Sequence, residues 1–191
     1  MLKKEETVLF KKHNIENYSK IKIEEIQNIK KINLRFDPNS KELKSITSKI
    51  LDIIIPTIPN TYSEKEKQKI IWLGPNEWLI IDSEEKLDDD LLNKSLGDEN
   101  ASVTNISESK TILRISGKKT FSLLSKFLVL DLEKNLSNDH LCVQTIFLKV
   151  PILLVRNKNF DNIIEIDIFI NRSHVNYIYN ILIDGTKNLD F

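Results

Sequence analysis

At 191 residues, the chain is long enough to bury one substantial core or two small ones. Its 28 Lys and Arg residues balance its 28 Asp and Glu residues, so the net charge is zero and no long-range field would attract nucleic acid. The single cysteine, Cys142, excludes an internal disulfide and indicates a reducing, cytoplasmic location. Because there is no secretory signal and no apolar run of about 20 residues, we expect no membrane partner.

The first 28 residues are highly charged and contain little apolar sequence. Their apolar islands are short, at residues 7–10 and around Ile21 and Ile23. We therefore predict an N-terminal arm over residues 1–28 that is either poorly ordered or laid against a partner.

A first α/β subdomain is expected over residues 29–107. Alternating apolar and polar residues predict a strand over 29–36, and Ser40 is placed to cap a helix whose apolar residues recur at helical spacing. Pro56 and Pro59 then require an irregular segment, because proline fits neither a helix interior nor a central strand.

The apolar stretch 70–81 holds both tryptophans, Trp72 and Trp78, and is interrupted only by Gly-Pro-Asn-Glu. Pro75 and Asn76 suit the central positions of a tight turn, so the stretch predicts a hairpin. Both faces of both strands are apolar, which places them inside a sheet that is covered on its two sides. The hairpin is either a core element alone or also a contact to another subunit, because tryptophan is enriched in interface centres.

A second helix is predicted from Asp82, as a capping residue, to Leu96, with Gly97 as the stop. A strand over 101–106 follows. The resulting order of strand, helix, two strands, helix and strand is the split β-α-β arrangement of a ferredoxin-like sandwich.

A second α/β subdomain is expected over residues 108–185, with a tail over 186–191. Periodicity predicts its strands and helices in the following order: a strand over 111–116, a helix over 118–128, strands over 142–149, 152–156 and 164–170, and a helix over 173–183 that stops at Gly185. The fold class is therefore α+β, with mostly antiparallel sheets and helices packed on one face. The order fits two tandem sandwiches or one fused sheet assembly.

Short motifs that resemble ligand sites each lack residues that the chemistry requires. The run 116–120 has Gly-Lys but neither the first glycine of a phosphate loop nor its Ser or Thr after the lysine. His140 and Cys142 form a single pair, whereas structural zinc usually needs four ligands. Residues 88–90 lack the glycine and closing glutamate of a calcium loop, and no base is apparent that would activate Cys142. The sequence therefore predicts no catalytic, cofactor-binding or metal-binding residues.

The segment 72–79, Trp-Leu-Gly-Pro-Asn-Glu-Trp-Leu, is the most specific of several that together resemble one family. The supporting segments lie at 32–35, 59–61, 113–117, 142–145, 151–154 and 172–173. In order and spacing they resemble the gamma subunit family of heterotetrameric sarcosine oxidase across residues 26–185. Lys118 departs from the proline that the family often has after Ser-Gly.

The resemblance implies the fold of the glycine-cleavage T-protein and related folate-binding domains. It also implies a complex with alpha, beta and delta subunits that oxidatively demethylates sarcosine to glycine and forms 5,10-methylenetetrahydrofolate and hydrogen peroxide. In that family the partner subunits carry FAD, FMN, NAD and zinc, and the gamma subunit has no cofactor and no known catalytic role.

Four residues are candidates for contact with the partner subunits: Trp72, Asn76, Trp78 and Arg114. Two other functions are open at this stage. One is a free-standing folate-binding protein similar to an aminomethyltransferase, and the other is a general assembly or chaperone-like module.

Overall fold

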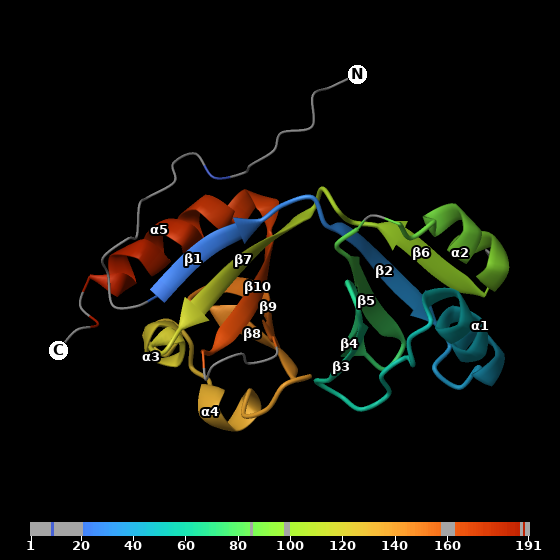
Figure 1. Ribbon diagram of the computed structural model, residues 1–191, viewed down its shortest axis with the longest axis horizontal. Coiled ribbons are helices and arrows are strands. Elements are labelled where there is room, and N and C mark those ends of the chain that lie inside the picture. The colour runs from blue at the N-terminus through green and yellow to red at the C-terminus, as the bar shows by residue number, and fades with distance from the viewer. Residues whose placement is uncertain are drawn as a thin grey trace, which may run out of the picture. The chain divides into compact units, whose positions relative to one another are not determined.

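The structure, a computed structural model, describes Leu9 and residues 21–84, 86–97, 100–157, 163–187 and 189. The chain divides into two compact units (Figure 1). The hairpin unit consists of Asn28–Ser107, and the composite unit combines Met1–Gln27 with Glu108–Phe191. Each unit has its own five-stranded antiparallel sheet, so the prediction of an α+β fold is confirmed.

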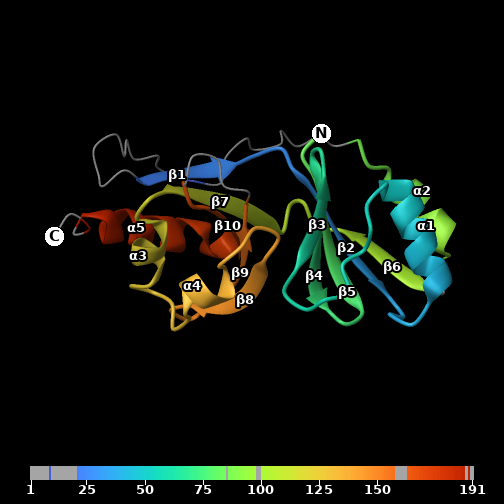
Figure 2. The same cartoon turned by 60° about the horizontal axis from the view of Figure 1, so that its bottom comes forward.

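The described residues of the hairpin unit form five strands and two helices. In chain order these are β2 (Lys30–Phe36), α1 (Lys41–Leu51), β3 (Tyr62–Lys65), β4 (Gln68–Gly74), β5 (Glu77–Asp82), α2 (Asp89–Leu96) and β6 (Ala101–Asn105). The strand order is β3-β4-β5-β2-β6, and both helices lie on one face of the sheet (Figures 1 and 2). Apart from the additional strand β3, this is the predicted split β-α-β arrangement.

The two faces of β5 are both buried, as the apolar runs of the sequence predicted. Trp78 and Ile80 belong to the core that β2, β4 and β5 form with the two helices. Leu79 and Ile81 point to the opposite face and are also buried. Ser40 caps α1 as predicted, because its hydroxyl accepts a hydrogen bond from the Leu43 amide at 3.2 Å.

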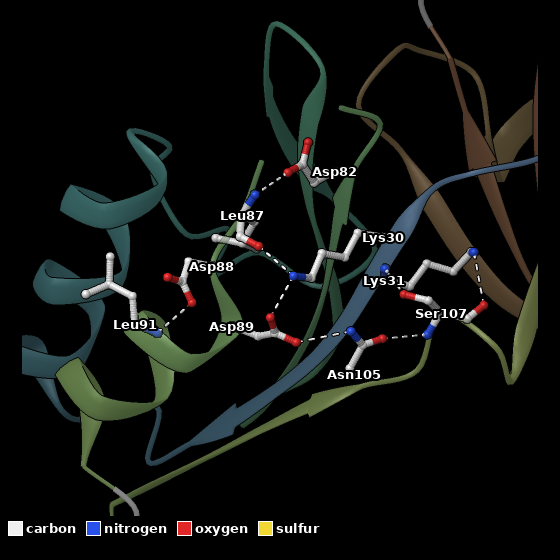
Figure 3. Close-up of polar contacts among 9 residues, drawn as sticks. All are labelled: Lys30, Lys31, Asp82, Leu87, Asp88, Asp89, Leu91, Asn105 and Ser107. Carbon is white, nitrogen blue, oxygen red and sulfur yellow. Dashed lines mark hydrogen bonds and ion pairs between the residues drawn. The ribbon is translucent and has the colours of Figure 1, made fainter. Parts of the chain in front are cut away.

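The second helix begins later than predicted. Asp82 does not cap it; its carboxylate accepts hydrogen bonds from the amides of Glu84 at 3.0 Å and Leu87 at 2.7 Å. The cap of α2 is Asp88, which accepts from the Leu91 amide at 3.0 Å (Figure 3). An aspartate can stabilise a turn with the same hydrogen bonds that it offers a helix, so sequence alone placed the start too early. Gly97 ends the helix as predicted, with a φ of 78°.

A polar network joins β2, α2 and β6 at one end of this sheet (Figure 3). The Lys30 ammonium donates to the Leu87 carbonyl and to the Asp89 carboxylate, both at 2.6 Å. The second carboxylate oxygen of Asp89 accepts a hydrogen bond from the side-chain amide of Asn105 at 3.1 Å. The side-chain oxygen of Asn105 in turn accepts one from the backbone N–H of Ser107 at 3.0 Å. Each of these polar groups finds a hydrogen-bond partner within the network, so we assign the network a structural role.

Asp89 should make the stability of the hairpin unit depend on pH. The hydrogen bond from Lys30, which outweighs the opposing effect of burial, lowers the pKa of Asp89 below its usual value. The stabilisation is therefore complete above that usual value and is lost as pH falls through the lowered pKa. We expect Asp89→Asn to cost about 1 kcal/mol or less at pH 7 and less than that at pH 3. Urea unfolding of both proteins at the two pH values measures this difference, and an equal difference at both would contradict it.

The hydroxyl of Thr47 is a buried polar group on the inner face of α1. The side chain is fully buried, and its oxygen has no hydrogen-bond partner among the residues that the structure describes. Valine has the same shape without the group that loses its hydration on burial. We expect Thr47→Val to raise the free energy of unfolding by about 1 kcal/mol, with Thr57→Val at an exposed loop position as the control without effect. A urea midpoint for Thr47→Val below that of the wild type would contradict this expectation.

The composite unit begins with a strand from the N-terminal part of the chain. Its elements are β1 (Ile21–Ile26), β7 (Lys110–Gly117), α3 (Thr120–Leu124), α4 (Leu132–Asn135), β8 (Cys142–Phe147), β9 (Val150–Arg156), β10 (Glu165–Asn171), a 3-10 turn (Arg172–His174) and α5 (Val175–Thr186). The strand order is β1-β7-β10-β9-β8. Residues of all three helices join those of the sheet in one apolar core.

The position of β1 corrects the prediction of an arm for residues 21–26. This strand pairs with β7 (Figures 1 and 2). Ile21 and Ile23 are buried in the core. In its sheet β1 occupies the place beside β7 that β6 occupies beside β2 in the other sheet, and the described residues after β10 form no strand that could fill this place. Two alternating isoleucines were too short a pattern to reveal an edge strand. Apart from Leu9, which is buried, residues 1–20 of the predicted arm lie outside the described residues.

Two further predictions in this unit need correction, and one element was not predicted. The helix expected over 118–128 is shorter, and α4 was missed because it has a single turn. Pro151 lies within β9 instead of between two strands. It faces Ile146 of β8, and β10 pairs with β9 only from Leu153 onward, so the missing N–H of Pro151 breaks no bond to β10.

Gly185 does not end the last helix. The helix α5 continues to Thr186, and Gly185 lies inside it against the ring of Phe127. A Cβ atom at this position would lie 2.7 Å from the Phe127 ring and 2.9 Å from Leu123. Glycine is therefore required here by close packing, and not by a turn. Of the predicted tail, Leu189 is buried in the same core.

Candidate partner interface

The candidate interface is built around the tip of the β4–β5 hairpin. Trp72 and Trp78 are directly opposite each other in the register, and the register shifts between Trp72 and Gly74. Pro75 and Asn76 form the exposed turn between the strands, as predicted. Directly opposite residues share a face, so both indoles lie on the face that the helices cover.

Trp78 is a core residue that fixes the hairpin in the unit. Its side chain is 1% exposed, and its ring stacks on Phe36 with 4.6 Å between the ring centres. The indole N–H donates to the Pro56 carbonyl at 2.9 Å, so the one polar atom of the ring is satisfied. This bond ties the irregular segment that contains both prolines to the hairpin.

The same irregular segment presents two large apolar side chains to solvent. Ile54 is 80% exposed and Ile58 is 67% exposed. The Ile58 carbonyl accepts from the Thr61 hydroxyl at 2.7 Å, and the Thr61 carbonyl accepts from the Trp72 amide at 3.0 Å. We call the exposed Ile54, Ile58 and Asn76, together with the half-buried Trp72, the hairpin surface.

The two isoleucines of the hairpin surface were not among the residues predicted from the sequence. The available signal was isoleucine beside two prolines, in a segment where no helix or strand could bury it. Two large aliphatic side chains exposed to water in one short segment make that segment a candidate surface for contact with another protein.

Arg114 lies in the composite unit, on β7, and is held by carboxylates of β10. Its Nε and Nη2 donate to the two oxygens of Asp167 at 2.7 and 2.9 Å, and Nε lies 3.3 Å from Glu165. Burial lowers the pKa of Arg114, but the hydrogen bonds and charge of Asp167, with Glu165 and Glu24, outweigh it and raise the pKa. The hydrogen bonds of the Arg114 guanidinium described here are therefore made within its own sheet.

The four residues predicted to contact a partner thus have different environments. Trp72 and Asn76 belong to the hairpin surface, Trp78 is in the core, and Arg114 is paired within the other unit. Their contact with a partner stays a prediction, and the structure brings only the two tryptophans and Asn76 together in one place.

The described residues also show what the chain offers for chemistry. Cys142 is buried, and burial raises its pKa to about 12, so the thiol is inert at neutral pH. In the run 116–120, the Thr120 hydroxyl donates to the Gly117 carbonyl at 2.8 Å and the Lys119 ammonium donates to the Leu189 carbonyl, which is a strand-to-helix turn. Among the residues described, no group of three or more His, Cys, Asp or Glu could hold a metal ion.

A family model described as "Sarcosine oxidase, gamma subunit family" matches residues 42–188, which is most of the chain. The chain belongs to the sarcosine oxidase gamma subunit family. This match confirms the resemblance to the family that was predicted from the segment 72–79 and its supporting segments. Within the described part of this family member, no helix is long and apolar enough to cross a membrane.

A curated relative and two solved structures are similar to this gamma-family chain. Sarcosine oxidase subunit gamma of Corynebacterium sp. (strain P-1) is 33% identical over 92 residues, which span 48% of this chain and 45% of the relative. Heterotetrameric sarcosine oxidase from Corynebacterium sp. U-96 matches with a TM-score of 0.80 at 21% identity, over 90% of this chain and 86% of that one. Aminomethyltransferase T of the glycine cleavage system from Bartonella henselae matches with a TM-score of 0.61 at 10% identity, over 86% and 46%. Both structures share the fold, as predicted.

Proposed function

We propose that this chain is a non-catalytic gamma subunit of a cytoplasmic heterotetrameric sarcosine oxidase. In this proposal its partners are the alpha, beta and delta subunits, and the complex oxidatively demethylates sarcosine to glycine with formation of 5,10-methylenetetrahydrofolate and hydrogen peroxide. FAD, FMN, NAD and zinc belong to the partner subunits. The observation that carries the proposal is the family match over residues 42–188.

The side chains of the described residues support a structural role. The buried Asp167 is paired with Arg114, the buried Lys31, Asp82 and Arg156 form hydrogen bonds with backbone groups of the chain, and the one thiol is inert. What the described side chains present to a partner is apolar, notably Ile54 and Ile58 of the hairpin surface. An exposed isoleucine pair favours association over catalysis, because aliphatic side chains gain free energy on leaving water but take part in no proton transfer.

Co-purification from cells that produce all four subunits tests the proposal. We expect a tagged full-length chain to retain the other three subunits in equal amounts, and sarcosine-dependent peroxide formation to follow the complex. The isolated chain should show neither turnover nor bound flavin. A chain that never associates with the other subunits, or that binds flavin and turns over alone, would overturn the proposal.

A substitution in the hairpin surface tests the proposed partner contact more specifically in the same experiment. Ile58→Asp places a charge where the proposal expects an apolar contact, and it should reduce retention of the partners without changing the melting temperature of the isolated chain. Glu66→Asp, at an exposed position of the β3–β4 turn, is the control. Saturable binding of tetrahydrofolate by the isolated chain would instead support a free-standing folate-binding protein.

A further inference from the structure

The edge strand β6 of the hairpin unit leaves part of its backbone open to a further strand. It pairs with β2 on one side, and no strand of the described residues pairs with it on the other (Figures 1 and 2). The Ile106 amide donates to the Lys31 carbonyl at 2.8 Å, so these opposite residues form a hydrogen-bonded pair. Such pairs alternate with non-bonded pairs along an antiparallel ladder. Thr104 is therefore bonded to β2, whereas Val103 and Asn105 point their N–H and C=O groups away from it.

The other side of β2 agrees with this alternation. The Phe36 amide donates to the Asn76 carbonyl at 3.3 Å, on the side of β5. Its neighbour Arg35 therefore bonds on the side of β6. The outward groups of Val103 and Asn105 are two residues apart, which is about 6.8 Å along an antiparallel strand. This spacing matches the repeat of an extended backbone, so the groups are placed to bond a strand.

The sequence of β6 lacks the features that protect an edge strand. Charged side chains protect β1, which contains Lys22, Glu24 and Glu25, and β3, which contains Glu64 and Lys65. The edge strand β8 is uncharged, but two of its residues already take part in further interactions. The five residues of β6, Ala-Ser-Val-Thr-Asn, include no charge and no proline, and their register with β2 has no bulge. An unprotected edge presents its backbone as a template for another strand.

The side chains of β6 indicate which strand fits beside it. Ala101 and Val103 are partly buried and pack against the core of the hairpin unit. Ser102 and Thr104 alternate with them and are exposed on the opposite face. A strand that pairs with β6 extends both faces of the sheet. Its side chains should therefore alternate between apolar residues on the face of Val103 and polar residues beside the two hydroxyls.

The Asn105 end of β6 is acidic. The first turn of α2 lies at this end, where the Asn105 side-chain amide donates to Asp89 at 3.1 Å (Figure 3). Asp89 is paired with Lys30, but Asp88 and Asp90 are exposed, and neither forms an ion pair among the described residues. A basic residue in the incoming strand would be attracted to this end. A second copy of β6 does not supply one, because the strand is uncharged.

The short length of β6 means that its partner must also bind elsewhere. Five residues are far fewer than the roughly 20–30 that a stable interface takes on each side. The hairpin surface lies at one end of the same sheet. Phe36 bonds to Asn76 of the hairpin turn and is opposite Ala101 of β6, so two strand spacings, about 10 Å, separate the turn from β6. One partner can therefore contact both.

We propose that β6 binds an extended segment of a partner subunit as a sixth strand of the hairpin sheet. The segment bonds to the outward N–H and C=O groups of Val103 and Asn105. It alternates apolar and polar residues and carries a Lys or Arg near Asn105. The inference rests on the proposed function, because a partner subunit has to supply the strand.

Hydrogen exchange of the full-length wild-type chain, alone and in the four-subunit complex, tests this inference. In the isolated chain the amides of Val103 and Asn105 should exchange fast, whereas the Thr104 amide, which bonds to β2, should be protected. In the complex we expect exchange at Val103 and Asn105 to be slower by roughly tenfold or more. Mass spectrometry with electron-transfer fragmentation resolves these neighbouring amides. Unchanged exchange at both residues in the complex overturns the inference.

A proline substitution tests the same contact through assembly. Val103→Pro removes one outward N–H and breaks no bond to β2, so the urea midpoint of the isolated chain should stay close to that of the wild type. The apparent dissociation constant of the complex, measured by dilution and mass photometry, should rise about tenfold. Val103→Thr keeps the N–H and the side-chain shape and is the matched control. Asp90→Asn should make the affinity less sensitive to salt. If Val103→Pro lowers the urea midpoint, the hydrogen-exchange result decides.

The outcomes separate the two proposals. If the wild-type chain does not assemble, the proposed function fails and the inference fails with it. If the wild type assembles without protecting Val103 and Asn105, the inference alone is overturned. Protection in the isolated chain also overturns it. Protection that rises with concentration would assign the edge to a second copy, and protection independent of concentration would assign it to another segment of the same chain.

Discussion

Trp78→Ala should lower the free energy of unfolding by about 3–5 kcal/mol. The side chain is almost fully buried, stacks on Phe36 and donates to the Pro56 carbonyl, so alanine leaves both a cavity and a carbonyl without its donor. Because that bond connects the irregular segment to the hairpin, we also expect weaker retention of the partner subunits by the hairpin surface. Urea unfolding followed by far-ultraviolet circular dichroism measures the loss without depending on tryptophan fluorescence.

Two further substitutions give this prediction its controls. Trp72→Ala removes the other indole, which is only partly buried, and should cost about 1–2 kcal/mol. Trp78→Phe keeps most of the packing and removes the hydrogen bond, with an expected loss of about 1–2 kcal/mol. Equal losses for Trp72→Ala and Trp78→Ala would show that the hairpin is not anchored through Trp78.

Arg114→Met should destabilise the composite unit by about 2–3 kcal/mol. The substitution leaves the Asp167 carboxylate, whose side chain is 8% exposed, without the guanidinium that donates to both its oxygens. A fully buried pair loses about 3–5 kcal/mol when one partner is removed, and the loss here is smaller because Arg114 is 28% exposed. The same urea titration measures this change.

Arg172→Met provides a matched comparison. Arg172 is 30% exposed, almost the same as Arg114, but its carboxylate partner Glu108 is 65% exposed, so the expected loss is about 0–1 kcal/mol. The double variant Arg114→Met, Asp167→Leu should recover much of the stability, because no unpaired charge is then buried. If both arginine variants lost the same free energy of unfolding, Arg114 would not be essential to its sheet. That result would favour the prediction that Arg114 contacts a partner.

The periodic patterns of the sequence predicted most elements, including the hairpin at 70–81 and the strand at 164–170. They succeeded where each residue's local chemistry agreed with its burial, as for Pro75 and Asn76 in the turn. They failed where one residue type serves two local structures. Asp82 caps a turn and Asp88 caps the helix, and both have the same side chain.

The candidate interface was less accessible to sequence reasoning than the fold. Aromatic content marked Trp72 and Trp78 equally, and only packing against Phe36 and the Pro56 carbonyl showed that Trp78 is internal. Ile54 and Ile58 gave no periodic signal, because periodicity reports regular elements and these residues lie in none.

The sequence by itself determined the family, the α+β class and the positions of most strands and helices, because motif order and hydrophobic periodicity are local properties. Only the tertiary structure decided that β1, from the beginning of the chain, completes the sheet of the last residues beside β7. It also decided that Arg114 serves its own sheet and that Gly185 lies inside a helix against Phe127. These facts depend on pairings between residues far apart in the chain, and a pairing exists only once the fold has brought both partners together.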